Sequence, residues 1–275
     1  MPMAYKVRSE TLSILPPGSP EIRILHFSDL HLTPRRKTEI KDIKTFASLK
    51  PDLVIGTGDF LAHRNAVPDV LDALSELLEI PGLYVFGSND YYEPTFKNPL
   101  KYLMKDDGKR KLGKRLPWEL LDKSLRKSGW LNLNSSKEII YVKGVTIEVR
   151  GTDDAHLNQD CYSLVQGSIQ ENVDLGIGVT HAPYKRVIDA MANDHVDLIF
   201  AGHTHGGQIR FPWFGGSKAL TSNCDLPLWR SRGLTKVGDN PWLNVSAGMG
   251  ANPFFHLRTF CPPEVTLLCI KAKIM

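Results

Sequence analysis

The sequence predicts an α/β fold in which short buried strands alternate with amphipathic helices. Three apolar segments of strand length, 22–27, 53–55 and 83–86, each end in a polar tip rich in Gly, Asp, Ser or Asn. The stretches between them, 41–49 and 70–78, have the apolar spacing of short helices. This alternation indicates a parallel arrangement of strands, which places ligand-binding residues at the carboxyl ends of the strands. We therefore expect the functional residues at the polar tips.

Further strands follow a charged segment in the middle of the chain. A helix is expected at 118–128, and strands are expected at 138–141, 145–150, 175–180, 198–201, 242–246 and 264–270. We find no internal repeat, low-complexity tract or linker in the sequence. The simplest organisation is a single domain, 1–275, that carries residues 93–137 as an inserted basic cap.

Composition excludes several classes of protein. Apolar residues make up 42% of the 275 residues and charged residues 23%, which is typical of globular proteins and excludes disordered, fibrous and integral-membrane classes. The first residues lack a cationic leader followed by an apolar core, and no uncharged apolar run approaches the roughly 20 residues of a membrane helix. The four cysteines form no CxxC pair, so we expect reduced thiols. These features favour a cytoplasmic protein.

Five strand ends carry side chains suited to metal ions. They are Asp29 and His31 in SDLH, Asp59 in TGD, Ser88 or Asn89 in GSND, His181 in THAP, and His203 and His205 in AGHTHGG. Any one of these residues would more often be an ordinary core or turn residue, so the prediction depends on the whole set. Carboxylate, imidazole and amide ligands without thiolates suit Mn, Fe, Zn or Co. Two such ions about 3.5 to 4 Å apart can share a hydroxide nucleophile and bind phosphoryl oxygens.

In their order along the chain, these motifs resemble those of the calcineurin-like metallophosphoesterases. The pattern is D-x-H, GD, an element similar to G-N-H-D, a lone His, and G-H-x-H, and it covers residues 22–205. The stretch GHTHGGQIRFPWFG, with the later SAGMG and PPE, is similar to a bacterial branch that includes phosphodiesterases and hydrolases of lipid-linked nucleotide pyrophosphates. The resemblance implies a four-layer fold, in which a two-sheet β-sandwich is flanked by helices.

The resemblance also implies a role for each ligand and a reaction. The implied ligands are Asp29, His31 and His205 for one ion, His181, His203 and an amide for the other, and Asp59 as the bridge. The implied cofactors are two divalent or trivalent ions, Mn, Fe or Zn. The implied function is a dinuclear metal-dependent hydrolase of phosphodiester or pyrophosphate bonds, in which a metal-bridging hydroxide is the nucleophile. A catalytically silent binding protein and a phosphomonoesterase are the alternatives.

One motif departs from the family pattern, because GSND stands where G-N-H-D is usual. Read without a gap, Ser88 replaces the amide ligand and Asn89 replaces the catalytic His. If the loop shifts, Asn89 is the ligand, and we favour this because an amide oxygen is a better metal donor than an un-ionised hydroxyl. Loss of the imidazole costs about 10² to 10⁴ in rate for poor leaving groups, which favours activated esters or pyrophosphates. His63 and His156 are candidate replacements for it.

Substrate contacts are predicted at three further positions and on one surface. Ser88, Gln208 and Arg210 are candidates to contact the substrate phosphate. Residues 93–127 contain eleven Lys or Arg and five acids, interleaved with apolar residues. Such a segment is either a solvated face or a cap that makes peripheral contact with an anionic membrane and admits a lipid-linked substrate. No feature of the sequence indicates specificity for nucleic acid.

Overall fold

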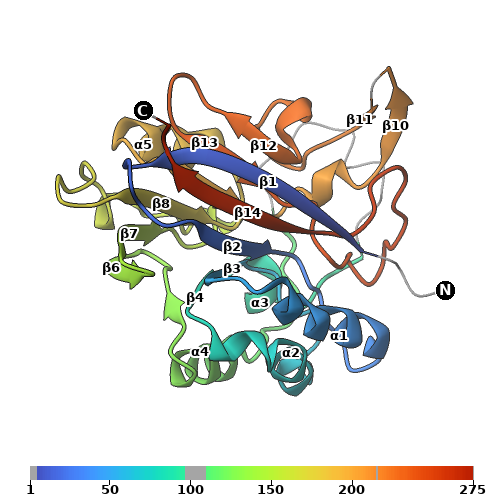
Figure 1. Ribbon diagram of the computed structural model, residues 1–275. Coiled ribbons are helices and arrows are strands. Elements are labelled where there is room, and N and C mark those ends of the chain that lie inside the picture. Colours follow the sequence, from blue (N-terminus) through green and yellow to red (C-terminus); the bar gives the residue numbers. More distant parts are fainter. Residues whose placement is uncertain (1–4, 97–109, 215, 275) are drawn as a thin grey trace.

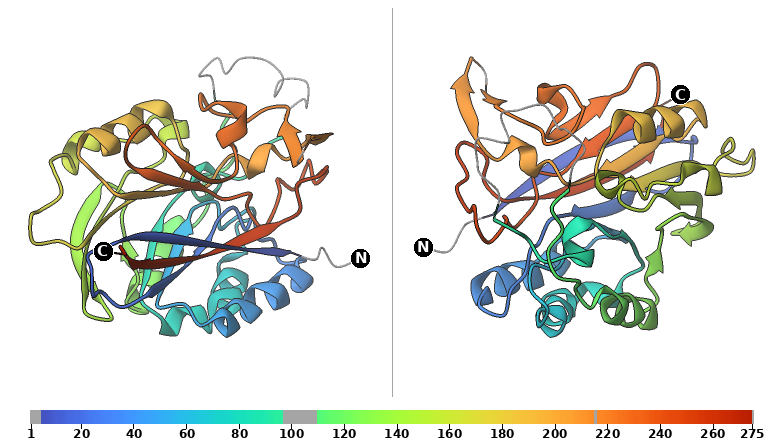
Figure 2. Two further views of the ribbon diagram at one scale, coloured as in Figure 1. Left: turned by 45° about the horizontal axis from the view of Figure 1, so that its top comes forward. Right: turned by 180° about the vertical axis from the view of Figure 1, so that it is seen from behind.

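The strands form two mixed six-stranded sheets that stack face to face, as seen in the computed structural model (Figure 1), which describes residues 5–96, 110–214 and 216–274. Helices cover the outer face of each sheet, so the chain has four layers (Figure 2). The predicted two-sheet sandwich flanked by helices is therefore confirmed. Every helix among the described residues is too short or too polar to cross a membrane.

The first sheet has a parallel centre. In spatial order its strands are β1 (Lys6–Leu15), β14 (Glu264–Ala272), β2 (Ile22–Phe27), β3 (Leu53–Thr57), β4 (Gly82–Val85) and β5 (Leu131–Asn132). Strands β2 to β5 are mutually parallel, whereas β14 is antiparallel to β2 and parallel to β1. The carboxyl ends of β2, β3 and β4 therefore lie at one edge.

The second sheet is also parallel at its centre and antiparallel at both margins. In spatial order its strands are β12 (Gly233–Lys236), β13 (Trp242–Val245), β9 (Leu198–Ala201), β8 (Leu175–Thr180), β7 (Val145–Gly151) and β6 (Ser136–Val142). Only β12 and β6 run antiparallel to their neighbours. A separate hairpin consists of β10 (Arg210–Trp213) and β11 (Gly216–Ala219).

Helices pack on the two outer faces of the sandwich. The α-helices are α1 (Lys37–Lys44), α2 (Val67–Leu74), α3 (Ser88–Tyr91), α4 (Trp118–Lys127) and α5 (Lys185–Asn193). Short 3₁₀ turns lie at Thr45–Leu49, Leu77–Glu79, Ala155–Leu157, Tyr162–Leu164, His205–Gly207 and Leu228–Arg230. Helices α1, α2 and α4 cover the first sheet, and α5 covers the second. The single turn α3 follows β4 and carries the GSND motif.

Strand β2 shows why the central strands appear in the sequence as continuous runs of apolar residues. Ile22 and Ile24 face the core between the sheets, whereas Leu25 and Phe27 face the core beneath the helices. Successive residues of a strand point to opposite faces, so a strand that is buried on both faces has no polar alternation. The same double burial holds the strand ends rigidly at the edge of the sandwich.

Several elements were not predicted from the sequence. Helix α5 buries Val187, Ile188 and Met191, an apolar spacing that does indicate a helix. Strand β1 alternates between exposed and partly buried residues, and its pairing with β14 determines its place in the sheet. Strands β5 and β12 and the β10–β11 hairpin also depend on long-range pairing, so their sequences carry weak local signals.

Part of the segment predicted as a basic cap belongs to the first sheet and to the helix layer that covers it. Leu121 and Leu125 of α4 are buried in the outer core together with Trp130, and β5 extends the sheet beside β4. Residues 97–109 lie outside the described residues. The extent of a cap within 93–137 and the single-domain organisation therefore stay predictions.

We expect Gly82→Ala to destabilise the first sheet. A methyl group at this position would overlap the indole ring of Trp130, which is buried and donates a hydrogen bond from Nε1 to the carbonyl of Ile80. The expected loss of unfolding free energy is about 1–3 kcal/mol, measured by denaturant unfolding. At Gly216 no described atom lies within 4 Å of an added Cβ, so Gly216→Ala is the control and should stay within about 0.5 kcal/mol. Equal stability of the two variants would contradict the packing of Trp130.

Candidate metal centre

The side chains that end five strands meet at one edge of the sandwich. Both sheets contribute: Asp29 and His31 follow β2, Asp59 follows β3, Asn89 follows β4, His181 follows β8, and His203 and His205 follow β9. All of these are buried except Asn89 and His205, which are partly exposed. Because each sheet alone supplies an incomplete set of donors, the site exists only where the sheets stack.

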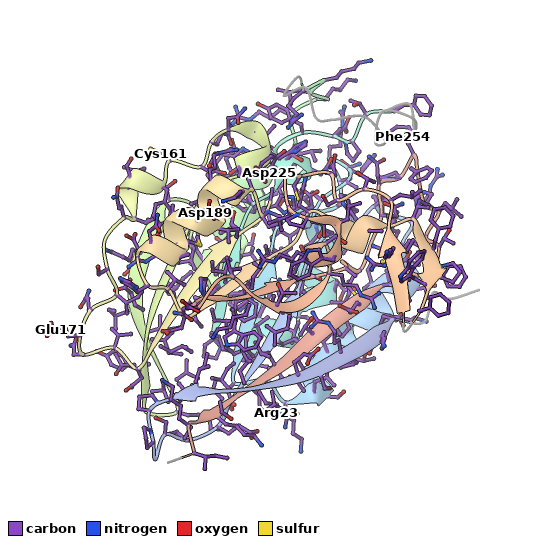
Figure 3. All side chains as sticks on the ribbon, turned by 90° about the horizontal axis from the view of Figure 1, so that it is seen from above. Arg23, Cys161, Glu171, Asp189, Asp225 and Phe254 are labelled. Carbon is purple, nitrogen blue, oxygen red and sulfur yellow. The ribbon has the colours of Figure 1, made fainter. Side chains whose placement is uncertain are left out.

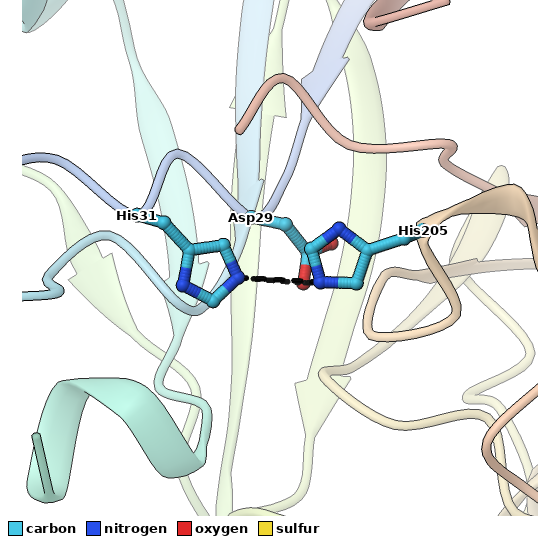
Figure 4. Close-up of side chains that lie close together, drawn as sticks. All are labelled: Asp29, His31 and His205. Carbon is cyan, nitrogen blue, oxygen red and sulfur yellow. Dashed lines mark hydrogen bonds and ion pairs between the residues drawn. The ribbon is translucent and has the colours of Figure 1, made fainter. Parts of the chain in front are cut away.

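The first cluster of donor atoms consists of Asp29, His31 and His205 (Figure 4). The two imidazole rings stack with their Nε2 atoms 3.2 Å apart, and Asp29 Oδ1 lies 3.6 Å from the Nε2 of His205. Burial lowers the pKa of both histidines well below the usual value, so both rings are neutral. Asp29 Oδ1 is buried and has no hydrogen-bond partner among the described residues. A carboxylate and two neutral imidazoles that converge in this way fit a divalent cation.

A second cluster consists of Asp29, Asp59 and His181. Asp59 lies between the two clusters, because its Oδ2 is 3.5 Å from His31 Nε2 and its Oδ1 is 3.6 Å from His181 Nε2. The Nδ1 of His203 is 3.3 Å from His181 Nε2. Burial, opposed by His181, raises the pKa of Asp29 to about 6. One carboxylate therefore faces both groups of donors with different oxygens.

Backbone carbonyls orient two of the histidines. His181 donates from Nδ1 to the carbonyl of Thr57 over 2.6 Å, which turns its Nε2 toward Asp59. His203 donates from Nε2 to the carbonyl of Asn223 over 3.1 Å, which turns its Nδ1 toward His181. A hydrogen bond from one ring nitrogen determines the tautomer and leaves the other nitrogen with its lone pair. Both rings thus present an unprotonated nitrogen to the site when they are neutral.

The chain turns sharply at the residues that carry these donors. Asp29, His31, Asp59, His203 and His205 all have left-handed backbone conformations, with φ of 53°, 44°, 54°, 67° and 48°. This conformation is unfavourable for residues with a Cβ and costs about 1–3 kcal/mol where the structure imposes it. Strain that coincides with five of the seven strand-end residues indicates a functional site. The turns direct side chains from the ends of strands into one volume.

Asp90 organises the loops of the first sheet, although the sequence analysis does not predict a role for it. It is buried, and its carboxylate accepts hydrogen bonds from the backbone N–H groups of Gly87, Asp59 and Leu61. Burial and the neighbouring Asp59 raise the pKa of Asp90 to about 8. Its position at the end of GSND was the available signal. Asp90 ties the β3 loop, which carries Asp59, to the β4 loop, which carries Asn89.

The two candidates in the GSND loop have different contacts. Asn89 donates from its backbone N–H and from its side-chain amide to the two oxygens of Asp59, over 2.8 and 2.6 Å. Ser88 lines the cavity above the site. Only Asn89 contacts the carboxylate that faces both clusters, so its amide is the better placed of the two.

A cavity opens above the donor atoms. Its lining includes the donor residues His31, Asp59, Asn89, His203 and His205, and also the apolar side chains Leu112, Ile209, Leu220 and Phe255. The lining therefore combines polar and apolar groups. A ligand with a phosphate and an apolar part fits this arrangement better than a uniformly polar ligand.

The structure distinguishes between His156 and His63, the two candidates to replace the catalytic His that the GSND motif lacks. His156 lines the cavity, its ring lies 4.5 Å from that of His203, and its Nδ1 is 3.1 Å from the hydroxyl of Tyr184. His63 does not line the cavity, and its Nδ1 accepts a hydrogen bond from the backbone of Asn65 in its own loop. Of the two, the structure brings only His156 to the site.

Of the candidates for substrate contact, Gln208 lines the cavity and Arg210 does not. Gln208 lines the cavity, and its amide donates to the carbonyls of Phe255 and Leu257. Arg210 is buried, is not among the residues that line the cavity, and donates to the carbonyl of Gly206 and the hydroxyl of Ser217. Arg210 therefore supports the turn that carries His205.

Two arginines lie beside the donor residues or line the cavity. Arg258 is 3.3 Å from His205 Nδ1 and donates to the carbonyl of Ala247, and burial lowers its pKa. Arg110 lines the cavity and donates to the carbonyl of His156 and to the Tyr184 hydroxyl. Their positive charges favour an anionic ligand.

Comparisons with known proteins were consistent with this geometry. The sequence profile of the family described as calcineurin-like phosphoesterases matches residues 22–207. The chain is similar to an uncharacterized metallophosphoesterase of Aquifex aeolicus, with 27% identity over 98% of this chain and 91% of the relative. It is also similar to the phosphodiesterase YaeI of Escherichia coli, with 25% identity over 96% and 87% of the two chains. A further relative is the UDP-2,3-diacylglucosamine pyrophosphatase LpxG of Chlamydia trachomatis, with 25% identity over 90% and 83%.

Metal binding is expected to release protons in a pH-dependent way. Burial by itself would lower the pKa of His181, but Asp59, Asp154 and Asp29 raise it to about 9 in the metal-free protein. A cation must displace this proton below pH 9, so apparent affinity should rise about tenfold per pH unit toward pH 9 and then level off. Titration calorimetry with Mn²⁺ in buffers of different ionisation enthalpy should detect at least one released proton at pH 7.

His181→Asn and the exposed His195→Asn form a matched pair for this measurement. The first should bind Mn²⁺ more weakly and release fewer protons, whereas the second should behave as the wild type. Proton release at pH 7 that is unchanged in His181→Asn would contradict the assignment.

Proposed function

This chain belongs to the calcineurin-like phosphoesterase family, and from that premise we propose that it is a dinuclear metal-dependent hydrolase of phosphodiester or pyrophosphate bonds. The observation that carries the proposal is the position of Asp59, whose two oxygens face His31 and His181 in neighbouring clusters of donor atoms. The relatives named as a phosphodiesterase and as a pyrophosphatase support this reaction class. We propose Mn, Fe or Zn as the ions and the cytoplasm as the place of action.

Each side chain at the site has a proposed role. Asp29, His31 and His205 would hold one ion, and His181, His203 and the amide of Asn89 would hold the other, with Asp59 shared between them. When bound, the ions would activate a water molecule and neutralise charge on the phosphoryl group. The carbonyls of Thr57 and Asn223 keep His181 and His203 in the tautomers that this arrangement needs.

The protein itself would supply substrate orientation and the leaving-group proton. Arg258 and Arg110 would attract the phosphate toward the donor residues, while Leu220 and Phe255 would contact an apolar part of the substrate. His156 is the proposed proton donor, because it lines the cavity beside His203. The apolar part of the lining supports an amphiphilic or lipid-linked substrate.

Hydrolysis of an aryl phosphodiester and of an aryl phosphomonoester tests the proposal. With Mn, Zn, Fe or Co supplied, the diester should turn over faster than the monoester. Equal or faster monoester hydrolysis would indicate a phosphomonoesterase. Turnover of neither ester with any of these ions would indicate a catalytically silent protein that retains the fold for binding, which the altered GSND loop would then explain.

Asp59→Asn is expected to abolish diester hydrolysis and to lower the number of bound ions, because a neutral amide cannot bridge two cations as a carboxylate does. Metal analysis after gel filtration gives the stoichiometry, and circular dichroism checks the fold. Asp239→Asn, at an exposed position in a loop, is the matched control and should retain both activity and metal. Normal stoichiometry and rate in Asp59→Asn would refute the bridging role.

His156→Ala should affect poor leaving groups more than good ones. Removal of a general acid costs about 10² to 10⁴ in kcat for an alkyl leaving group and far less for p-nitrophenolate, which leaves without a proton. The same substitution at His63 removes an imidazole that lies in a loop outside the cavity, so it should change neither rate substantially. Equal losses for both leaving groups in His156→Ala would refute a role in proton transfer.

A further inference from the structure

A group of exposed aromatic side chains surrounds one side of the cavity mouth. We call it the aromatic rim and define it as Phe211, Trp213, Phe214, Trp229, Phe254 and Phe260, each of which is more than half exposed. Phe214 is 98% exposed. Aromatic side chains are normally buried or bound to a partner, so six of them gathered on one surface indicate an interaction site.

The rim is continuous although its residues come from three segments. Backbone hydrogen bonds join Arg210 to the carbonyl of Thr259, and Thr259 to the carbonyl of Gln208, so the β10–β11 hairpin and the loop 252–261 lie side by side. Figure 2 shows the two segments projecting together from the body, and Figure 3 shows Phe254 at the same end of the molecule. Leu220 and Phe255, which line the cavity, belong to these same segments. The rim therefore borders the entrance to the metal centre.

Most of the charged side chains in this region are positive. Residues 198–263 contain six Lys or Arg and two Asp. Two of these cations lie against rim tryptophans: Lys218 Nζ is 3.6 Å from the ring centre of Trp213, and the guanidinium of Arg230 is 4.6 Å from that of Trp229. Lys and Arg beside Trp and Phe are typical of surfaces that contact the headgroups of anionic lipids.

The hairpin can enter a headgroup layer with the hydrogen bonds between its two strands intact, and water in that layer can bond the outer edges of the strands. Strands β10 and β11 pair through four residues each, from Arg210 with Ala219 to Trp213 with Gly216. The buried Arg210 anchors the base of the hairpin through the carbonyl of Gly206. Insertion to the depth of the hydrated headgroups therefore places Trp213 and Phe214 in the interface while β10 and β11 stay paired with each other.

We propose that the aromatic rim docks the protein on an anionic lipid bilayer, with the cavity mouth facing the membrane surface. This inference goes beyond the proposed hydrolysis, because docking requires neither bound metal nor turnover. It assigns membrane contact to the hairpin, the turn 228–230 and the loop 252–261. A substrate that lies in the bilayer would meet the cavity without leaving the membrane.

Co-sedimentation with vesicles tests the proposal. The wild type should bind phosphatidylglycerol/phosphatidylcholine vesicles, and bind pure phosphatidylcholine vesicles more weakly. Phe214→Ser/Trp229→Ser should lower binding to the anionic vesicles about tenfold or more, because two interfacial anchors are removed. Tyr141→Ser/Leu164→Ser is the matched control, since it removes two large side chains, each also more than half exposed, from β6 and the turn Tyr162–Leu164, which do not belong to the rim. It should bind as the wild type does.

Tryptophan fluorescence with brominated phosphatidylglycerol identifies the surface that inserts. Trp213 and Trp229 should be quenched, whereas Trp213→Phe/Trp229→Phe should still sediment with vesicles but lose most of the quenching. The three tryptophans that remain, Trp118, Trp130 and Trp242, are buried or partly buried and lie outside the rim. Absence of vesicle binding by the wild type, or equal loss in the rim and control variants, would overturn the proposal and direct attention to a protein partner. A protein that binds vesicles yet hydrolyses no ester would overturn the proposed function alone.

Discussion

The site depends on keeping two carboxylates, Asp29 and Asp59, buried where the two sheets meet. A buried charge is costly unless hydrogen bonds or a cation compensate it. Asp29 accepts hydrogen bonds from Ser28 and from the backbone of His203, and Asp59 accepts two from Asn89, yet Asp29 Oδ1 has no partner among the described residues. The surrounding imidazoles turn nitrogen atoms toward this region. The arrangement is stable as a whole when positive charge occupies it.

A series of buried polar contacts connects the metal-ligand candidate His181 to residues in the core between the two sheets. Thr57 accepts from His181 at its carbonyl and contacts His26 through its hydroxyl. His26 contacts Asn244 of the other sheet, and Arg8 donates to Asn244. Burial and then Arg8 lower the pKa of His26 to about 3, so the ring stays neutral and serves as a hydrogen-bonding spacer. The tautomer of His181 is thus supported by contacts that cross the core.

The cavity combines two chemical environments that suit one kind of substrate. Its lining includes histidines and carboxylates, Arg110 lines it and Arg258 lies beside His205, and apolar side chains such as Leu220 and Phe255 also line it. The aromatic rim continues the apolar surface from these side chains to the outside of the molecule. A phosphate group bound at the donor residues and an apolar group bound against the apolar side chains would use both parts at once.

The sequence by itself determined the central strands of both sheets and the residue types that follow them. Apolar runs identified the central strands, and the polar residues after each run identified Asp29, His31, Asp59, His181, His203 and His205, because burial on both faces and the geometry of strand ends leave local signals. Only the tertiary structure decided which residues meet. The sequence does not distinguish His156 from His63 as a proton donor. In the structure, the loop after β7 brings His156 to the cavity, whereas the loop after β3 leaves His63 outside it. The role of Asp90, the places of β1, β5 and β12 in their sheets and the assembly of the aromatic rim all come from contacts between segments distant in the chain. Local residue patterns do not specify such contacts.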